Sequence, residues 1–226
     1  MSIAEKFEII ADAVYDKGKQ DEYDRFWDTY QNFGNKRIYT YAFGGEGWTD
    51  ELLKPKYPIV TTTGNNKTNQ MFYFASNVKK IMFPIYLYES SNNSTFYGAS
   101  QLEQIGDDTG GGLWVTKSRT YTSNFTSCSA LKEIRFIDYN EKGEYVPSEI
   151  GNDISFSSCS LFSAESLINI IKHLVQNPDA SASERKTLSI HPTAFERLGT
   201  WGSPWDAGID FDGGWSWYLE SIGWDM

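Results

Sequence analysis

"FTSCSALKEI", residues 125–134, is one of several stretches of the same shape in this chain of 226 residues. "FYGASQLEQI" begins at Phe96, "FYFASNVKKI" begins at Phe72, and a half-copy, "FSSCS", begins at Phe156. Successive copies start 24, 29 and 31 residues apart, and a period of about 20 to 50 residues is typical of stacked repeats. We therefore expect each copy to form one layer of a stack, because no layer could bury its Phe and aliphatic side chains alone.

Alternating apolar residues predict strands after two of these copies. "MFPIYLY" places Phe83, Ile85 and Leu87 on one face, which we expect to point inward, and "IRFIDY" after Ile134 alternates in the same way. The opposite face is either a contact surface or is buried under the inserted stretch "DDTGGGLWVTKSRTYTS". The side chains expected on that face are Met82, Tyr86, Tyr88, Arg135, Ile137 and Tyr139.

The repeated pattern F-x-x-[AC]-S-x-[LV]-x-x-I resembles the BspA-like, or Treponema-type, leucine-rich repeat. "YAFGGEGWTDELLKPKYPI", residues 41–59, is similar to the degenerate first repeat of that family. "IAEKFEIIADAVYDKGKQDEYDRFWDTYQ", residues 3–31, is similar to the leader helix of small repeat proteins encoded in phages and prophages of gut Firmicutes. The resemblance implies an α+β solenoid: an irregular BspA-like leucine-rich repeat with an N-terminal helix and a helix/strand C-terminal cap. The repeat spacing here is longer and less even than in the family.

The expected organisation has three parts. Residues 1–34 form a helical attachment or oligomerisation segment, residues 35–160 the solenoid, and residues 161–226 a Trp-rich capping region. In the first part an apolar stripe at helical spacing either packs on the following repeats or joins the protein to itself or to a larger assembly. That stripe consists of Ile3, Phe7, Ile10 and Val14.

The C-terminal part has its own signals. Ser163 is an expected N-cap for the helix "AESLINIIKHLVQN", whose apolar face comprises Leu167, Ile170, Ile171 and Leu174. "KTLSI" is predicted as a strand, "TAFERL" as a short helical turn and "GWSWYL" as a final strand.

Tryptophan is concentrated at the end of the chain, with five of the eight residues in positions 201–226. They either cover the open end of the stack or pack a subunit contact, or they form an aromatic platform for a sugar or a protein partner. Trp215 and Trp217 are the candidate binding residues here.

The sequence offers little support for catalysis or for a metal. His173 and His191 lack a neighbouring nucleophile, and the spacing of Asp206, Asp210 and Asp212 fails the calcium-loop pattern, so these acids are expected in turns. The paired acids of a glycosidase find no support in the spacing of the 30 acidic residues. We expect no catalytic residue, no metal site and no cofactor.

Charge, hydropathy and cysteine usage exclude further classes. The formal net charge of −10 argues against a nucleic-acid partner, because phosphates attract clustered Lys and Arg. No signal peptide and no stretch of about 20 apolar residues is visible, so membrane insertion is not expected. Cys128 and Cys159 occupy the slot that holds Ala75 and Ala99 in other copies, which favours buried free thiols over a disulfide.

The expected function is that of a non-enzymatic, phage virion-associated structural or adhesion protein. The N-terminal helix would attach it, and the repeat surface would face a neighbouring subunit, another copy, or a glycan or protein of the host surface. One alternative is an intracellular protein-interaction module in the cytoplasm of the bacterial host. A less favoured alternative is a small carbohydrate-binding or carbohydrate-active protein.

Overall fold

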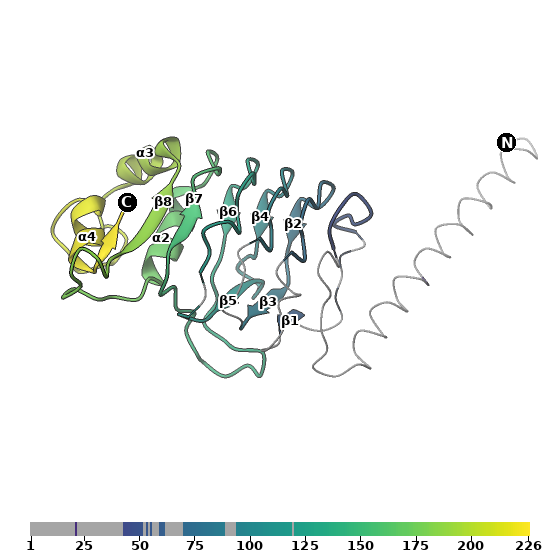
Figure 1. Cartoon of the computed structure of the whole chain (residues 1–226), viewed down its shortest axis with the longest axis horizontal. Coiled ribbons are helices and arrows are strands. Elements are labelled where there is room, and N and C mark those ends of the chain that lie inside the picture. The colour runs from purple at the N-terminus through teal and green to yellow at the C-terminus, as the bar shows by residue number, and fades with distance from the viewer. Residues whose placement is uncertain are drawn as a thin grey trace, which may run out of the picture.

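The computed structural model describes Asp21 and residues 43–51, 53, 55, 59–61, 70–88, 94–118 and 120–226. The expected assembly stripe at Ile3, Phe7, Ile10 and Val14 lies outside the described residues, as does nearly all of the predicted N-terminal helix. The described part is a mixed α/β structure built from small parallel sheets (Figure 1). No helix in this part of the chain is long and apolar enough to cross a membrane.

Two short parallel sheets run side by side along the molecule (Figure 1). The copies that begin at Phe72 and Phe96 each contribute one strand to each sheet, and the chain bends between the two strands. One sheet contains β1 (Ile59–Thr61), β3 (Pro84–Leu87) and β5 (Gly112–Val115) in that order. The other contains β2 (Lys80–Ile81), β4 (Gln104–Ile105) and β6 (Glu133–Ile134).

The strand predictions are confirmed only in part. The strand expected in "MFPIYLY" exists as β3. "IRFIDY" does not form one strand: β6 ends at Ile134, and Phe136 makes a single parallel bridge to Leu113 in the other sheet. The inserted stretch contains β5, which pairs with β3. It therefore extends a sheet and is not a cover laid over the outer face.

The spacing that recurs inside the repeated unit follows from its backbone turns. The inward residues of one copy are Phe96, Ala99, Leu102 and Ile105, three positions apart and all buried. Ala99 donates its backbone N–H to the carbonyl of Phe96, and Leu102 donates to that of Ala99, so the segment makes two successive three-residue turns. Residues three apart lie above one another in such turns. The turn, and not strand alternation, therefore places the small residue of each copy, here Ala99, in the interior.

Phenylalanine rings join the layers through the middle of the molecule. Phe72 and Phe96 have ring centroids 5.4 Å apart, Phe96 and Phe125 5.6 Å, and Phe125 and Phe156 4.7 Å, all stacked and all buried. Phe43 extends the row, 5.1 Å from Phe72. Backbone bonds also join the layers, as between the Phe96 N–H and the Asn124 carbonyl. The Phe-led segments thus lie side by side, while their assignment to the BspA-like family stays a prediction.

The cysteines fill the small slot of two adjacent layers. Cys128 and Cys159 are free and buried, and the Cys128 thiol contacts the carbonyl oxygen of Phe96 at 3.0 Å. Burial raises the pKa of Cys128 to about 12 and also raises that of Cys159. Both therefore behave as small apolar side chains.

After the last complete repeat the chain forms helices. Ser163 caps α2 (Ala164–Lys172) by accepting a bond from the Ser166 N–H at 3.2 Å, which confirms the predicted cap. Three residues of the predicted apolar face, Leu167, Ile170 and Ile171, are buried on α2. The predicted helix is too long, since α2 ends at Lys172 and Leu174 is buried in a parallel bridge to Ile150. Ser166 and Asn169 accept the backbone N–H groups of Ile134 and Phe136, at 3.0 and 2.8 Å. Side chains of α2 therefore satisfy the edge that a further strand would otherwise cover.

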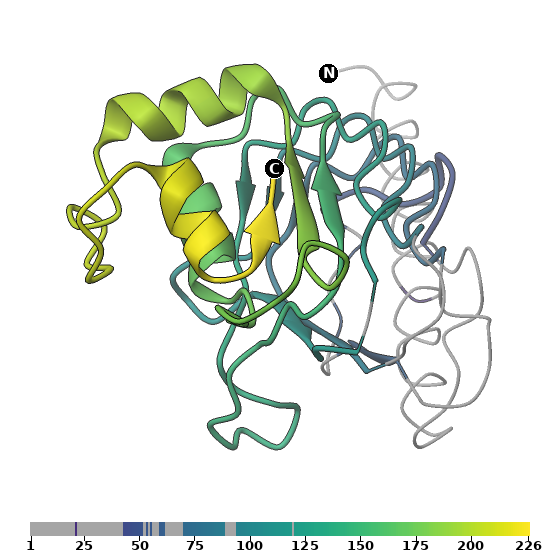
Figure 2. The same cartoon turned by 60° about the vertical axis from the view of Figure 1, so that its left-hand side comes forward.

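The end of the chain forms a third parallel sheet and two helices (Figures 1 and 2). The sheet contains β7 (Ile154–Phe156), β8 (Lys186–Ile190) and β9 (Trp224–Asp225), which confirms the strand "KTLSI". The predicted turn "TAFERL" lies within a longer helix, α3 (Pro192–Trp201), capped by the His191 side chain.

The predicted final strand "GWSWYL" is wrong. These residues form α4 (Trp215–Ser221). The alternation of two Trp residues suggested a strand, but the buried residues Trp215, Tyr218, Leu219 and Ile222 follow the helical spacing of three and four. A two-residue strand, β9, follows instead.

Candidate binding groove at the C-terminal end

The sequence-predicted binding residues fall in three different surroundings. Tyr86 is buried, with only 5% of its surface exposed, and so cannot meet a partner directly. Its ring lies beside Trp114 of β5, with centroids 6.3 Å apart. Burial, and then the negative charge of Glu141, raise the pKa of Tyr86. The row of outward side chains expected from alternation is therefore interrupted where β5 packs against β3.

The segment after β6 covers part of that face. Trp114 donates its indole N–H to the carbonyl of Val146 at 2.7 Å, and the Tyr88 hydroxyl donates to Glu141. Tyr139 and Tyr145 face each other across an antiparallel bridge, and both are exposed. Tyr88 is thus tied to this segment, whereas Tyr139 remains accessible.

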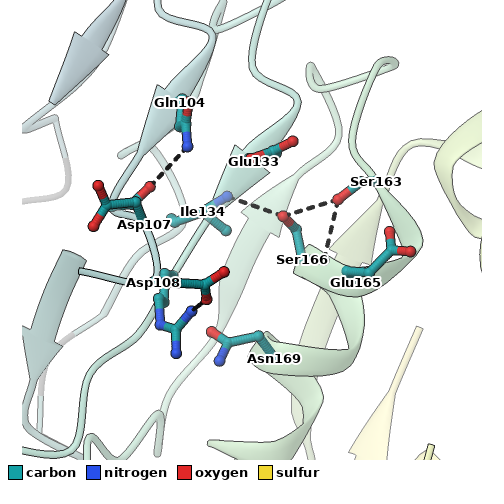
Figure 3. A pocket seen from close by; sticks show the side chains of 11 residues that line it. Gln104, Asp107, Asp108, Glu133, Ile134, Ser163, Glu165, Ser166 and Asn169 are labelled. Carbon is teal, nitrogen blue, oxygen red and sulfur yellow. Dashed lines mark hydrogen bonds and ion pairs between the residues drawn. The ribbon is translucent and has the colours of Figure 1, made fainter. Parts of the chain in front are cut away.

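Arg135 lies in a polar pocket of about 350 Å³ between the β4–β6 edge and the start of α2 (Figure 3). It pairs with Asp108. Most other polar groups there already serve the fold: Ser166 and Asn169 accept backbone N–H groups, and Asp107 accepts from Thr109. This pocket marks the place where a helix replaces the next strand, and we do not take it as the binding site.

Trp215 and Trp217 come together in a second cavity, a groove of about 570 Å³ between α3 and α4. Figure 2 brings this end of the molecule forward, with the light-green α3 beside the yellow α4. The groove is lined by Phe195, Gly199, Gly202, Ser203, Gly214, Trp215, Ser216 and Trp217. We call these eight residues the terminal groove.

The two tryptophans of the terminal groove have different roles. Trp215 is only 4% exposed and donates its indole N–H to the carbonyl of Gly202 at 2.8 Å, so it holds the loop between the helices against α4. Trp217 is 69% exposed. Two roles are predicted for these tryptophans, core packing and a binding platform. Trp215 has the structural role, and Trp217 is available to a ligand.

Helical spacing explains which side of α3 faces the groove. Ala194 and Leu198 are buried, and α3 packs against α2. Phe195 and Gly199, four positions apart, line the groove instead. The sequence patterns predict neither residue as part of a site, although a glycine within a helical pattern is a usable signal.

Three of the remaining polar candidates, His191, His173 and Asp206, have structural partners, and Asp210 and Asp212 are exposed. His191 accepts the Thr193 N–H at 3.2 Å, and His173 contacts Asp138 at 3.0 Å. Asp206 accepts the backbone N–H and the hydroxyl of Ser203, which together lower the pKa of Asp206. Within the described ranges no group of three or more His, Cys, Asp or Glu side chains could hold a metal ion.

Comparisons with protein-family models, with curated proteins and with solved structures each found no match.

Proposed function

We propose that this protein is a non-catalytic binding protein that engages its partner through the terminal groove. One observation carries the proposal: an open, mostly apolar groove exposes 69% of Trp217 at the end of the layered structure. Its volume lies in the range of about 300–1,000 Å³ that is usual for ligand sites. A large exposed indole in a concave site is what binding surfaces favour, because it gives much contact area for little conformational entropy.

The glycines of the groove support the proposal independently. A Cβ atom added to Gly199 or Gly214 would meet nothing within 4 Å, and neither residue has a positive φ. The fold therefore does not demand glycine at position 199 inside α3, whereas Gly214 is the N-cap of α4, where glycine is common. Within a helix glycine costs about 1 kcal/mol relative to alanine. An unneeded glycine that lines a cavity is explained if the space beside it serves a ligand.

Groove-dependent binding is expected on arrays. The full chain, labelled at its surface, is applied to peptide and glycan arrays beside the variant Gly199→Leu, in which a side chain fills the groove. Because space is open at position 199, the variant should fold and still lose binding. Thr200→Leu is the matched control, since Thr200 is exposed on the same helix and does not line the groove.

The array result decides the proposal in either direction. Array peptides or glycans that bind the wild type and Thr200→Leu, but not Gly199→Leu, would support the proposed function. Arrays without any feature that depends on Gly199 would contradict it.

We further propose that this binding protein belongs to a phage particle. The support is the resemblance of its repeat pattern and its N-terminal stretch to small phage-encoded repeat proteins. Mass spectrometry of purified particles from a phage carrying this gene should then find the protein in amounts comparable to those of minor structural proteins. Its presence only in the infected-cell lysate would favour the alternative, an intracellular interaction module.

A further inference from the structure

The charges around the terminal groove restrict the chemistry of its ligand. Residues 192–226 contain six acidic side chains and one basic side chain, so this stretch carries a formal charge of −5. The acids are Glu196, Asp206, Asp210, Asp212, Glu220 and Asp225, of which Asp225 pairs with Arg185 at 3.2 Å. The basic residue, Arg197, donates from its Nη1 to the carbonyls of Ser160 and Phe162, at 2.6 and 3.2 Å. A polyanionic ligand would therefore find repulsion at this end of the molecule.

One of these carboxylates is fixed next to the groove. Asp206 accepts from Ser203, which lines the groove, and its Oδ2 lies 2.8 Å from where a Cβ on Gly202 would be. Hydrogen bonds from the Ser203 N–H and hydroxyl hold Asp206 in its ionised form. A negative charge thus lies beside Ser203 and Gly202, at the rim of the groove that Trp217 also lines.

The polar groups of the lining argue against a sugar. The Ser203 hydroxyl already donates to Asp206, and the Trp215 indole N–H already donates to Gly202. A polyhydroxylated ligand needs several donors and acceptors that converge on it, whereas most of the lining surface is apolar. An apolar stem with a cationic end meets both the indole and the carboxylate.

We propose that the terminal groove binds an arginine or lysine side chain presented by a basic segment of a partner protein. The aliphatic stem lies along Phe195 and Trp217, and the cationic head faces the Trp217 ring and Asp206. Tryptophan is the aromatic side chain that binds cations best. The inference rests on the proposed function of the groove and adds the ligand class to it.

Fluorine NMR of the full chain labelled with 5-fluorotryptophan tests the ligand class. The Trp217 resonance is assigned from its loss in Trp217→Phe. The probe is the peptide acetyl-Gly-Ser-Arg-Ser-Gly-amide, and its citrulline counterpart has the same shape without the charge. Chito- and cello-oligosaccharides are the neutral glycan probes.

The arginine peptide should shift the Trp217 resonance saturably, and the citrulline peptide should bind about tenfold more weakly. Asp206→Asn and 0.5 M salt should each weaken the arginine peptide severalfold. Gly199→Leu should abolish the shift, and Thr200→Leu should retain it.

Each contrary outcome has its own meaning. Equal binding of the arginine and citrulline peptides, or saturation by an oligosaccharide alone, would overturn the cationic ligand and leave the groove as the binding site. No Trp217 shift with any probe, alongside array binding that depends on Gly199, would also overturn only the ligand class. Arrays without such binding would overturn the proposed function itself.

Discussion

Replacing Phe125 by alanine is expected to lower the free energy of unfolding by about 3–5 kcal/mol. Phe125 is 1% exposed and stacks on Phe96 on one side and on Phe156 on the other. Its removal leaves a cavity between three successive layers. Because each layer has no core of its own, the loss cannot be relieved by local collapse without moving the neighbouring layers apart.

Denaturant unfolding followed by circular dichroism measures this loss. Phe125→Leu, which restores much of the volume, should cost clearly less than the alanine variant. Phe74→Ala is a control two layers away, where the side chain is 50% exposed, and should cost about 1 kcal/mol or less. Similar losses for Phe125→Ala and Phe74→Ala would show that the ring row does not hold the layers together.

Gly112→Ala is expected to destabilise the protein by more than about 2 kcal/mol. Gly112 has φ +146°, and a Cβ there would lie 2.6 Å from the carbonyl oxygen of Arg135. That oxygen accepts the Leu113 N–H at 2.8 Å, a bond that joins two layers. The backbone at Arg135 therefore cannot retreat without breaking the contact between layers.

The matched control for this glycine is Gly199→Ala, where an added Cβ meets nothing within 4 Å. It should leave stability unchanged or raise it by up to about 1 kcal/mol. Thermal unfolding of both variants measures the contrast. An equally mild effect at Gly112 would mean that adjacent layers do not approach as closely as described.

Sequence patterns identified the features that depend on local spacing. The Phe-led unit, the Ser163 cap and the strand at residues 186–190 each leave a signal within about ten residues. The local composition of "DDTGGGL", rich in Asp and Gly, predicts a flexible surface turn. Gly111 and Gly112 are in fact buried where the backbones of neighbouring layers approach, and such long-range contact has no local signature.

The candidate site shows the same limit. Of the aromatic residues that the sequence suggested for binding, Trp217 is exposed, whereas β5 and the segment after β6 bury Tyr86. Whether an aromatic side chain is exposed depends on which later segment packs over it. A glycine within a helical pattern marks Gly199 as unusual, but Phe195 can be recognised as a groove residue only once α3 and α4 are placed together.

The most direct test of the account is the affinity of a groove-binding array ligand for wild type and for Gly199→Leu, with unfolding measured on both. We expect Gly199→Leu to lose at least tenfold in affinity, about 1.4 kcal/mol, with stability unchanged or increased. Equal affinities in two equally folded proteins would contradict it, because the terminal groove would then be a by-product of packing.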